Sequence, residues 1–144
     1  MQTTLGRTGD YGVRAVLDVA RTYGHGRRKT REIAQAMNIP PRYLSQLLAL
    51  LVRVEILTAT AGPSGGYELA RPPEELTLLD VVEAIEGSVA LERCVVRGIP
   101  CSSDGICAVH DAWSAAQDAM AGRLAETNFA ELAARDRELL AESR

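Results

Sequence analysis

Apolar side chains recur at three- and four-residue spacing near the start of the chain, which is the period of one face of an α-helix. Positions 9–23 carry such a stripe and predict a first helix that packs into a core. A glycine break at 24–26 and a basic run follow it. The next apolar stripe predicts a second, shorter helix over 30–37, with Thr30 as its N-cap. We therefore expect two helices joined by a basic loop.

A tight turn and a leucine-rich stripe predict a third helix over 41–54. Positions 38–41 supply turn chemistry, and Pro41 suits the first position of a helix. The inward face is expected to carry four leucines at helical spacing, Leu44, Leu47, Leu48 and Leu51. The outward face is polar, basic and small, with Arg42, Ser45, Gln46, Ala49 and Arg53. Helix, turn and helix in this order predict a helix-turn-helix.

Two short β-prone runs, 56–61 and 67–70, come directly after the third helix. The segment that joins them, 62–66, contains three glycines and a proline and therefore predicts a hairpin with a glycine-rich tip. A hairpin that follows a helix-turn-helix is a wing. The predicted fold class is accordingly mainly α with a small β-hairpin wing.

The second half of the chain predicts further helices around a loop. Thr77 and Asp80 have the spacing of a capping box, which opens a helix that ends before Gly87. A loop over 88–106 separates it from a long helix over 107–127. One stripe of that helix is apolar and requires a partner; its members are Val109, Ala112, Trp113, Ala116, Met120 and Leu124. A last, short helix is expected after Asn128.

Composition and charge narrow the class of protein. At 144 residues, 47% hydrophobic and 24% charged, the chain has the make-up of one soluble globular domain with an appended helix. It shows no secretory pattern and no apolar run long enough for a membrane span, so we expect a cytoplasmic protein. Residues 1–71 carry ten basic against five acidic side chains, whereas residues 72–144 carry six against fourteen. A basic first half favours contact with nucleic acid.

The sequence argues against an enzyme. It contains two histidines, no glycine-rich phosphate loop after a strand, and no motif that pairs a nucleophile with a base.

Three cysteines are the chain's whole thiol content, and they lie close together in the loop: Cys94, Cys101 and Cys107. An odd number cannot pair completely, and a cytoplasmic protein keeps its thiols reduced, so a disulfide framework is disfavoured. Thiolates select zinc or iron–sulfur centres, and the paired short knuckles of structural zinc sites are absent. Spacing alone leaves iron–sulfur, zinc and no metal open, with iron–sulfur favoured.

Several blocks together resemble the bacterial family of iron–sulfur winged-helix transcription regulators that includes IscR, NsrR and RirA. The blocks are GDYGVRAVLDVA at 9–20, IPPRYLSQLL at 39–48, GPSGGYELARP at 62–72 and LLDVVEAIEG at 78–87, followed by the cysteines. The resemblance implies a winged helix-turn-helix domain over 1–72, with a cluster-binding loop and dimerisation helices over 73–144. It also implies a homodimer on a pseudo-palindromic double-stranded DNA operator, with no membrane partner. Ala61 departs from the family, whose members often carry arginine there, so the resemblance does not imply minor-groove reading by the wing.

The resemblance also implies a ligand set for the metal. Cys94, Cys101 and Cys107 would hold an iron–sulfur cluster that senses cluster supply, redox state or nitric oxide. His110, three positions after Cys107, resembles the fourth ligand of the IscR-like branch and favours a [2Fe–2S] cluster. Asp10 resembles the aspartate of the NsrR-like branch, where the cluster is [4Fe–4S]. A regulator with a zinc, thiol-redox or metal-free effector site is the alternative interpretation.

The candidate DNA contacts divide into two kinds. Arg42 and Gln46 have the reach for base edges if the third helix enters the major groove. Phosphate contacts are expected from basic side chains, namely Arg27, Arg28, Lys29 and Arg53. Ser45, on the same helix face, and Ser64, at the wing tip, complete the set.

Overall fold

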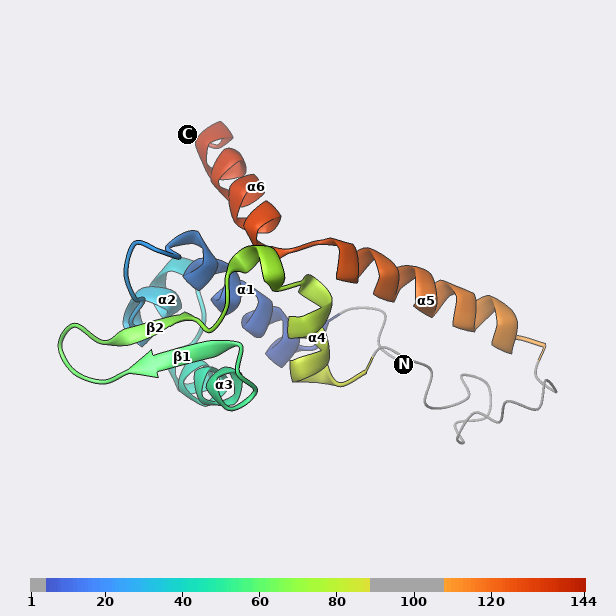
Figure 1. Cartoon of the computed structure of the whole chain (residues 1–144), viewed down its shortest axis with the longest axis horizontal. Coiled ribbons are helices and arrows are strands. Elements are labelled where there is room, and N and C mark those ends of the chain that lie inside the picture. Colours follow the sequence, from blue (N-terminus) through green and yellow to red (C-terminus); the bar gives the residue numbers. More distant parts are fainter. Residues whose placement is uncertain (1–4, 89–107) are drawn as a thin grey trace.

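The computed structural model of the 144-residue chain describes residues 5–88 and 108–144. Figure 1 shows a helical body with a two-stranded hairpin on one side and a long helix that extends from the other side. The described elements, in chain order, are α1 (Arg7–Arg21), α2 (Thr30–Met37), α3 (Pro41–Arg53), β1 (Leu57–Thr60), β2 (Gly66–Leu69), the 3₁₀ turn η1 (Pro73–Glu75), α4 (Leu78–Glu86), α5 (His110–Glu126) and α6 (Phe129–Glu142). The predicted fold class, mainly α with a hairpin wing, is confirmed.

Turn chemistry places the helix-turn-helix as the sequence predicts, apart from one cap. The C-cap of α2 is Asn38, which adopts the left-handed conformation at φ 52° and donates its N–H to the carbonyl of Ala34. Pro41 occupies the first position of α3. The expectation that Thr30 caps α2 is wrong, because Thr30 is already helical and Lys29 is the N-cap. The N–H of Lys29 donates to the side chain of Glu32 at 3.1 Å.

The wing is a short antiparallel hairpin in which Leu57 pairs with Leu69 and Thr60 pairs with Gly66. A side chain at Gly65 would collide with the backbone of Thr60 and Ala61, so the tip closes only with glycine there. Buried leucines therefore fix the base of the hairpin, and the glycine at position 65 permits its tight tip.

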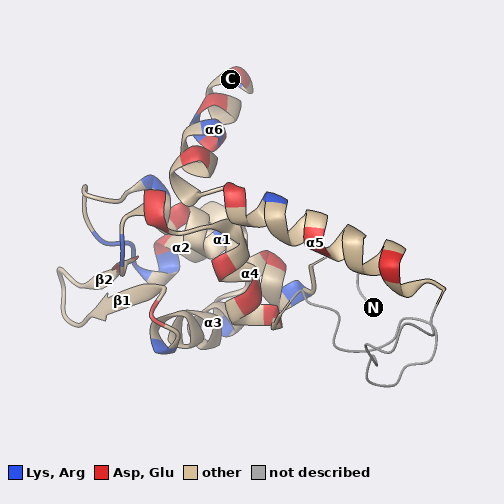
Figure 2. Cartoon of the chain, turned by 45° about the vertical axis from the view of Figure 1, so that its right-hand side comes forward, with Lys and Arg blue, Asp and Glu red and all other residues tan. Residues whose placement is uncertain are grey.

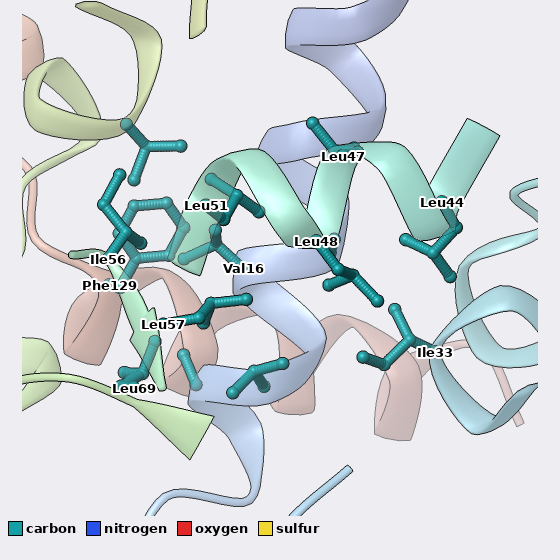
Figure 3. Close-up of a cluster of buried hydrophobic side chains, with 14 of the residues drawn as sticks. Val16, Ile33, Leu44, Leu47, Leu48, Leu51, Ile56, Leu57, Leu69 and Phe129 are labelled. Carbon is teal, nitrogen blue, oxygen red and sulfur yellow. The ribbon is translucent and has the colours of Figure 1, made fainter. Parts of the chain in front are cut away.

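One hydrophobic core holds the elements together. The leucine face of α3 packs against α1, α2 and the base of the wing (Figure 3); the labelled members include Val16, Ile33, Leu48, Leu57, Leu69 and Phe129. α1 and α4 approach closely because position 12 is glycine, and a Cβ there would collide with Ile85. Val81 of α4 and Phe129 of α6 belong to this core, so it draws on residues from both sides of the expected boundary at 72/73.

The last two helices differ in how much they bury. α5 contacts α4 but extends away from the body (Figure 1), and none of its residues is fully buried. α6 runs for 14 residues and is longer than the short helix that the sequence predicted. Its length has two causes: Asn128 accepts a hydrogen bond from the N–H of Glu131 at 2.9 Å, and Phe129 and Ala133 are buried at its start. No helix in the described part of the chain is long and apolar enough to cross a membrane.

Candidate nucleic-acid interface and sensor segment

The exposed face of α3 presents the residues that the sequence predicted for base contact. Arg42, Ser45 and Gln46 are exposed and lie at i, i+3 and i+4, so they share one face. Arg53 follows Arg42 by three helical turns and is exposed on the same side. Ala49 is exposed between them and leaves room for close approach to another surface. Because the opposite face of α3 is fixed in the core, this face has a defined orientation.

An aromatic and cationic cluster at the start of α3 was not among the sequence-based candidates. The ring of Tyr43, which is half exposed, lies 6.2 Å from the ring of Tyr11, and the guanidinium of Arg14 lies 4.9 Å from the Tyr11 centroid. Arg14 also donates to the carbonyl of Met37 at 2.6 Å. The signal that could have found this cluster is the aromatic side chain at Tyr43, on the outward side of a helix whose inward face is all leucine.

Arg28 and Lys29, both expected to contact phosphate, have partners within the chain. Arg28 donates to both carboxylate oxygens of Asp18, at 2.8 and 3.2 Å, and those hydrogen bonds raise the pKa of Arg28 above its ordinary value. Lys29 donates through Nζ to the carbonyl of Pro63 at 2.7 Å. The structure thus gives both residues a part in holding the wing. Their contact with phosphate stays a prediction.

The buried carboxylate of Asp18 is the residue of this region that sequence reasoning missed. Its side chain is 2% exposed, and the residue belongs to the part of α1 in which Val19 and Ala20 are also buried. The signal was a single acidic residue between Leu17 and Val19, in an otherwise apolar run.

Ser64 and Arg27 lie on or beside the wing. Ser64 is exposed at the tip, next to the carbonyl that accepts from Lys29. Arg27 is exposed and pairs with Glu68 of β2 at 3.4 Å. Figure 2 shows basic positions on α2, the loop before it and α3, whereas the charged positions of α4 are acidic and α5 is mostly uncharged with scattered acidic positions. The charge asymmetry of the sequence is thus also an asymmetry in space.

The residues expected at the metal lie partly outside the described part of the chain. Cys94, Cys101 and Cys107 are outside it, and residues 5–88 and 108–144 contain no group of three or more potential metal ligands. His110 is the first residue of α5 and is half-buried. Asp10 lies in the first turn of α1, with its side chain 53% exposed, and pairs with Arg14 at 2.7 Å.

One contact brings the end of α4 to the start of α1. The carboxylate of Glu86, the last residue of α4, accepts a hydrogen bond from the N–H of Gly6 at 2.6 Å. The chain therefore leaves α4 for the cysteine segment beside the helix terminus that carries Asp10. It returns at α5, where His110 stands first. Asp10 thus lies one turn from the contact at the end of α4, and His110 lies where α5 begins.

A helix-turn-helix whose third helix exposes a polar face, followed by a hairpin, defines a winged-helix transcription regulator. The chain belongs to the Rrf2 family, described as iron-dependent transcriptional regulators, whose model matches residues 5–135. This membership confirms the family resemblance that the sequence motifs indicated.

The similar proteins include two kinds of regulator, IscR and CymR. The HTH-type transcriptional regulator IscR of Photorhabdus laumondii is 32% identical over 124 residues, which cover 86% of this chain and 75% of that protein. Among solved structures, IscR of T. potens is similar with a TM-score of 0.79 and 25% identity, covering 96% of this chain and 92% of that one. CymR, the global cysteine regulator of B. subtilis, is similar with a TM-score of 0.80 and 25% identity, covering 93% and 98%.

Proposed function

We propose that this transcription regulator binds an operator as a homodimer, with α3 in the major groove and the wing against the flanking backbone. The observation that carries the proposal is the exposed face formed by Arg42, Ser45 and Gln46 on a helix whose other face is locked in the core. Gln46 and Arg42 have the donors and reach for bidentate contacts with base edges, and Arg53 is placed to neutralise phosphate.

The test compares two glutamines of the same helix-turn-helix. Operators are first selected from a random duplex pool with the parent protein. Gln46→Ala is expected to lose discrimination at one base-pair position of each half-site, by roughly 1–3 kcal/mol. Gln35→Ala, which changes an exposed glutamine of α2, is the matched control and should keep the full preference. Equal effects of the two substitutions across operator variants would rule out α3 as the base reader.

For the effector, we propose an iron–sulfur cluster held by Cys94, Cys101 and Cys107, with [2Fe–2S] preferred over [4Fe–4S]. The family's description as iron-dependent and the likeness to IscR support this proposal. The donor chemistry fits, because thiolates are the usual ligands of such clusters and an imidazole or carboxylate can complete the set. When bound, the cluster would supply a redox- and nitric-oxide-sensitive link across the cysteine segment.

His110 is the preferred fourth ligand and Asp10 the alternative. The carboxylate of Asp10 already pairs with Arg14 at 2.7 Å, and Asp10 lies 84 positions before Cys94 in the sequence. His110 follows Cys107 by three positions. The contact between Glu86 and Gly6 joins the end of α4 to the start of α1, which supports keeping Asp10 as the alternative.

Anaerobic purification with absorption spectra and iron and sulfide analysis tests the cluster. Cys101→Ser is expected to lose iron and sulfide, whereas Ser103→Ala, in the same segment, should retain both. His110→Ala and Asp10→Asn then separate the fourth ligands by electron paramagnetic resonance of the reduced cluster. An altered spectrum in Asp10→Asn alone would assign the carboxylate and favour [4Fe–4S].

A thiol-redox or zinc-dependent effector site is the second candidate, and the likeness to CymR, described as a global cysteine regulator, supports its thiol-based form. In that case the anaerobic protein contains no sulfide, and Cys101→Ser abolishes either zinc content or the response of DNA binding to oxidant. The same purification therefore distinguishes the two candidates.

A further inference from the structure

Asp18 is a charged side chain that the fold buries. The residue is 1% exposed and lies in the last third of α1, two arginines being its side-chain partners. Taking a carboxylate out of water costs several kcal/mol unless it is paired and fully hydrogen-bonded. An apolar side chain at this position would avoid that cost, so stability alone does not explain the carboxylate.

Two arginines satisfy the buried carboxylate. Arg28 donates to it from Nε and Nη2, at 2.8 and 3.2 Å, and Arg21 donates from Nη2 at 2.7 Å. Two cations on one anion leave an excess of positive charge. Asp136 of α6 offsets it on Arg21 at 3.0 Å, and Glu32 of α2 offsets it on Arg28 at 3.4 Å. Because the pair is bidentate, it fixes the position and the orientation of the Arg28 guanidinium, which a contact between two point charges would not do.

The backbone of Arg28 is joined to the wing. Its N–H donates to the carbonyl of Tyr67 at 2.9 Å, and the N–H of Tyr67 donates back at 2.7 Å. Tyr67 lies on β2 and pairs with Ala59 of β1 on its other side. Gly66 allows this approach, because a Cβ there would come within 2.7 Å of the Arg28 carbonyl. Arg28 is therefore bound by its side chain to α1 and by its backbone to the wing.

We propose that Asp18 is a positioning residue for DNA recognition, which fixes the wing against α1 through the contact of Arg28 with Tyr67. A two-stranded hairpin is marginally stable by itself, so its direction relative to α3 depends on what holds its strands. Leucine contacts at the base resist separation, but they are non-directional. The charge-assisted hydrogen bonds between Arg28 and Asp18 depend on direction, so they add an orientation to the contact between the wing and α1. The part of this proposal that concerns DNA rests on the proposed function.

The experiment uses two variants and a matched control. Asp18→Asn keeps the shape of the side chain and removes its charge. Arg28→Lys keeps the charge but cannot form the bidentate pair, and it leaves Asp18 bound to Arg21, so it serves if Asp18→Asn does not fold. Glu138→Gln breaks the exposed pair with Arg135 on α6 and controls for the loss of one carboxylate.

Amide hydrogen exchange is measured on the full chain under conditions where urea titration shows each variant to be folded. Relative to amides of α3, exchange at the N–H groups of Arg28 and Tyr67 is expected to accelerate roughly ten- to a hundredfold in both variants and to stay unchanged in Glu138→Gln. Unchanged protection in folded Asp18→Asn or Arg28→Lys would overturn the proposal and leave Asp18 as a purely structural group.

A second readout connects the wing to DNA. Hydroxyl-radical footprints of the variants on the selected operator should lose protection at the flanks and keep it at the sites of α3, with a reduced preference for operator over random duplex. Flank protection equal to that of the parent would overturn the recognition role. A parent that selects no operator would refute the proposed function instead, and the exchange rates would still decide whether Asp18 holds the wing.

Discussion

At the scale of single residues, the basic side chains of the first half divide by what they contact. Arg28 and Lys29 donate to Asp18 and Pro63, so they order the wing whatever else they do. Arg42 and Arg53 are exposed along the outward face of α3. Affinity for a polyanion depends on charges that can displace condensed counterions, and the exposed pair is placed to do so.

Arg53→Gln is expected to weaken binding to all duplexes by a similar factor and to reduce the slope of log affinity against log salt by about 1. The cause is the loss of one phosphate contact with no loss of base contacts. Titrations of specific and random duplexes at several salt concentrations measure both quantities. Arg135→Gln, which removes a charge from α6, should leave the slope unchanged. A loss confined to the selected operator would show that Arg53 reads bases.

At the scale of elements, the wing and α5 depend on different contacts. The wing needs a tight tip within the hairpin itself, whereas the apolar side chains of α5 need a partner outside the helix. Trp113 and Leu124 are partly buried, whereas Val109 and Met120 are 40% and 44% exposed. Exposed apolar residues along one helix need a partner, and a second copy of α5 is the partner that we propose.

Met120→Glu is expected to shift the homodimer toward monomer, because it places a charge in the proposed contact between two copies of α5. Analytical ultracentrifugation over a range of concentrations measures the change. Ala125→Glu, on the opposite side of α5 by helical spacing, is the matched control. Dimerisation of equal strength in Met120→Glu would exclude this stripe as the interface.

Gly65→Ala is expected to disrupt the tip of the wing, since the added Cβ would collide with the backbone of Thr60 and Ala61. The expected result is faster amide exchange in β1 and β2 and weaker operator binding, with helix content retained by circular dichroism. Gly122→Ala on α5, where a Cβ meets nothing within 4 Å, should have no such effect. A wing that keeps its exchange protection in Gly65→Ala would show that the tip can relax to accept a side chain.

At the scale of the whole molecule, one core joins the helix-turn-helix and the wing to the C-terminal helix, α6. Phe129 is fully buried beside residues of α1, α3 and the wing, and its N–H donates to the carbonyl of Leu76 at 2.9 Å. α6 therefore folds onto the first half rather than onto α5, and the chain should unfold as one cooperative unit.

Phe129→Ala is expected to lower the free energy of unfolding by about 3–5 kcal/mol, because it removes a large side chain from a close-packed core. Urea unfolding followed by far-ultraviolet circular dichroism and by Trp113 fluorescence should give coincident transitions. Leu140→Ala, at an exposed position of the same helix, should change stability by less than about 0.5 kcal/mol. Two separate transitions in the parent would contradict a single core.

Local sequence patterns were sufficient to predict the helices of the helix-turn-helix, the wing, the cap at Thr77 and the exposed face of α3. Each of these depends on spacing or turn chemistry within a few residues: the leucine stripe orients α3, and the Thr77–Asp80 capping box opens α4. The cap of α2 was misplaced by one residue because Lys29 holds that position with its backbone, a role that side-chain preference does not reveal.

The sequence by itself thus determined the class of fold and the exposed face of α3, which we propose faces DNA. Only the tertiary structure decided what the charged side chains do. Asp18 and Arg28 are separated by ten positions and Lys29 and Pro63 by 34, and Arg21 reaches across the fold to Asp136. The sequence does not show whether a charged side chain faces solvent or a buried partner. Its role depends on which distant groups the packed helices bring within hydrogen-bond distance.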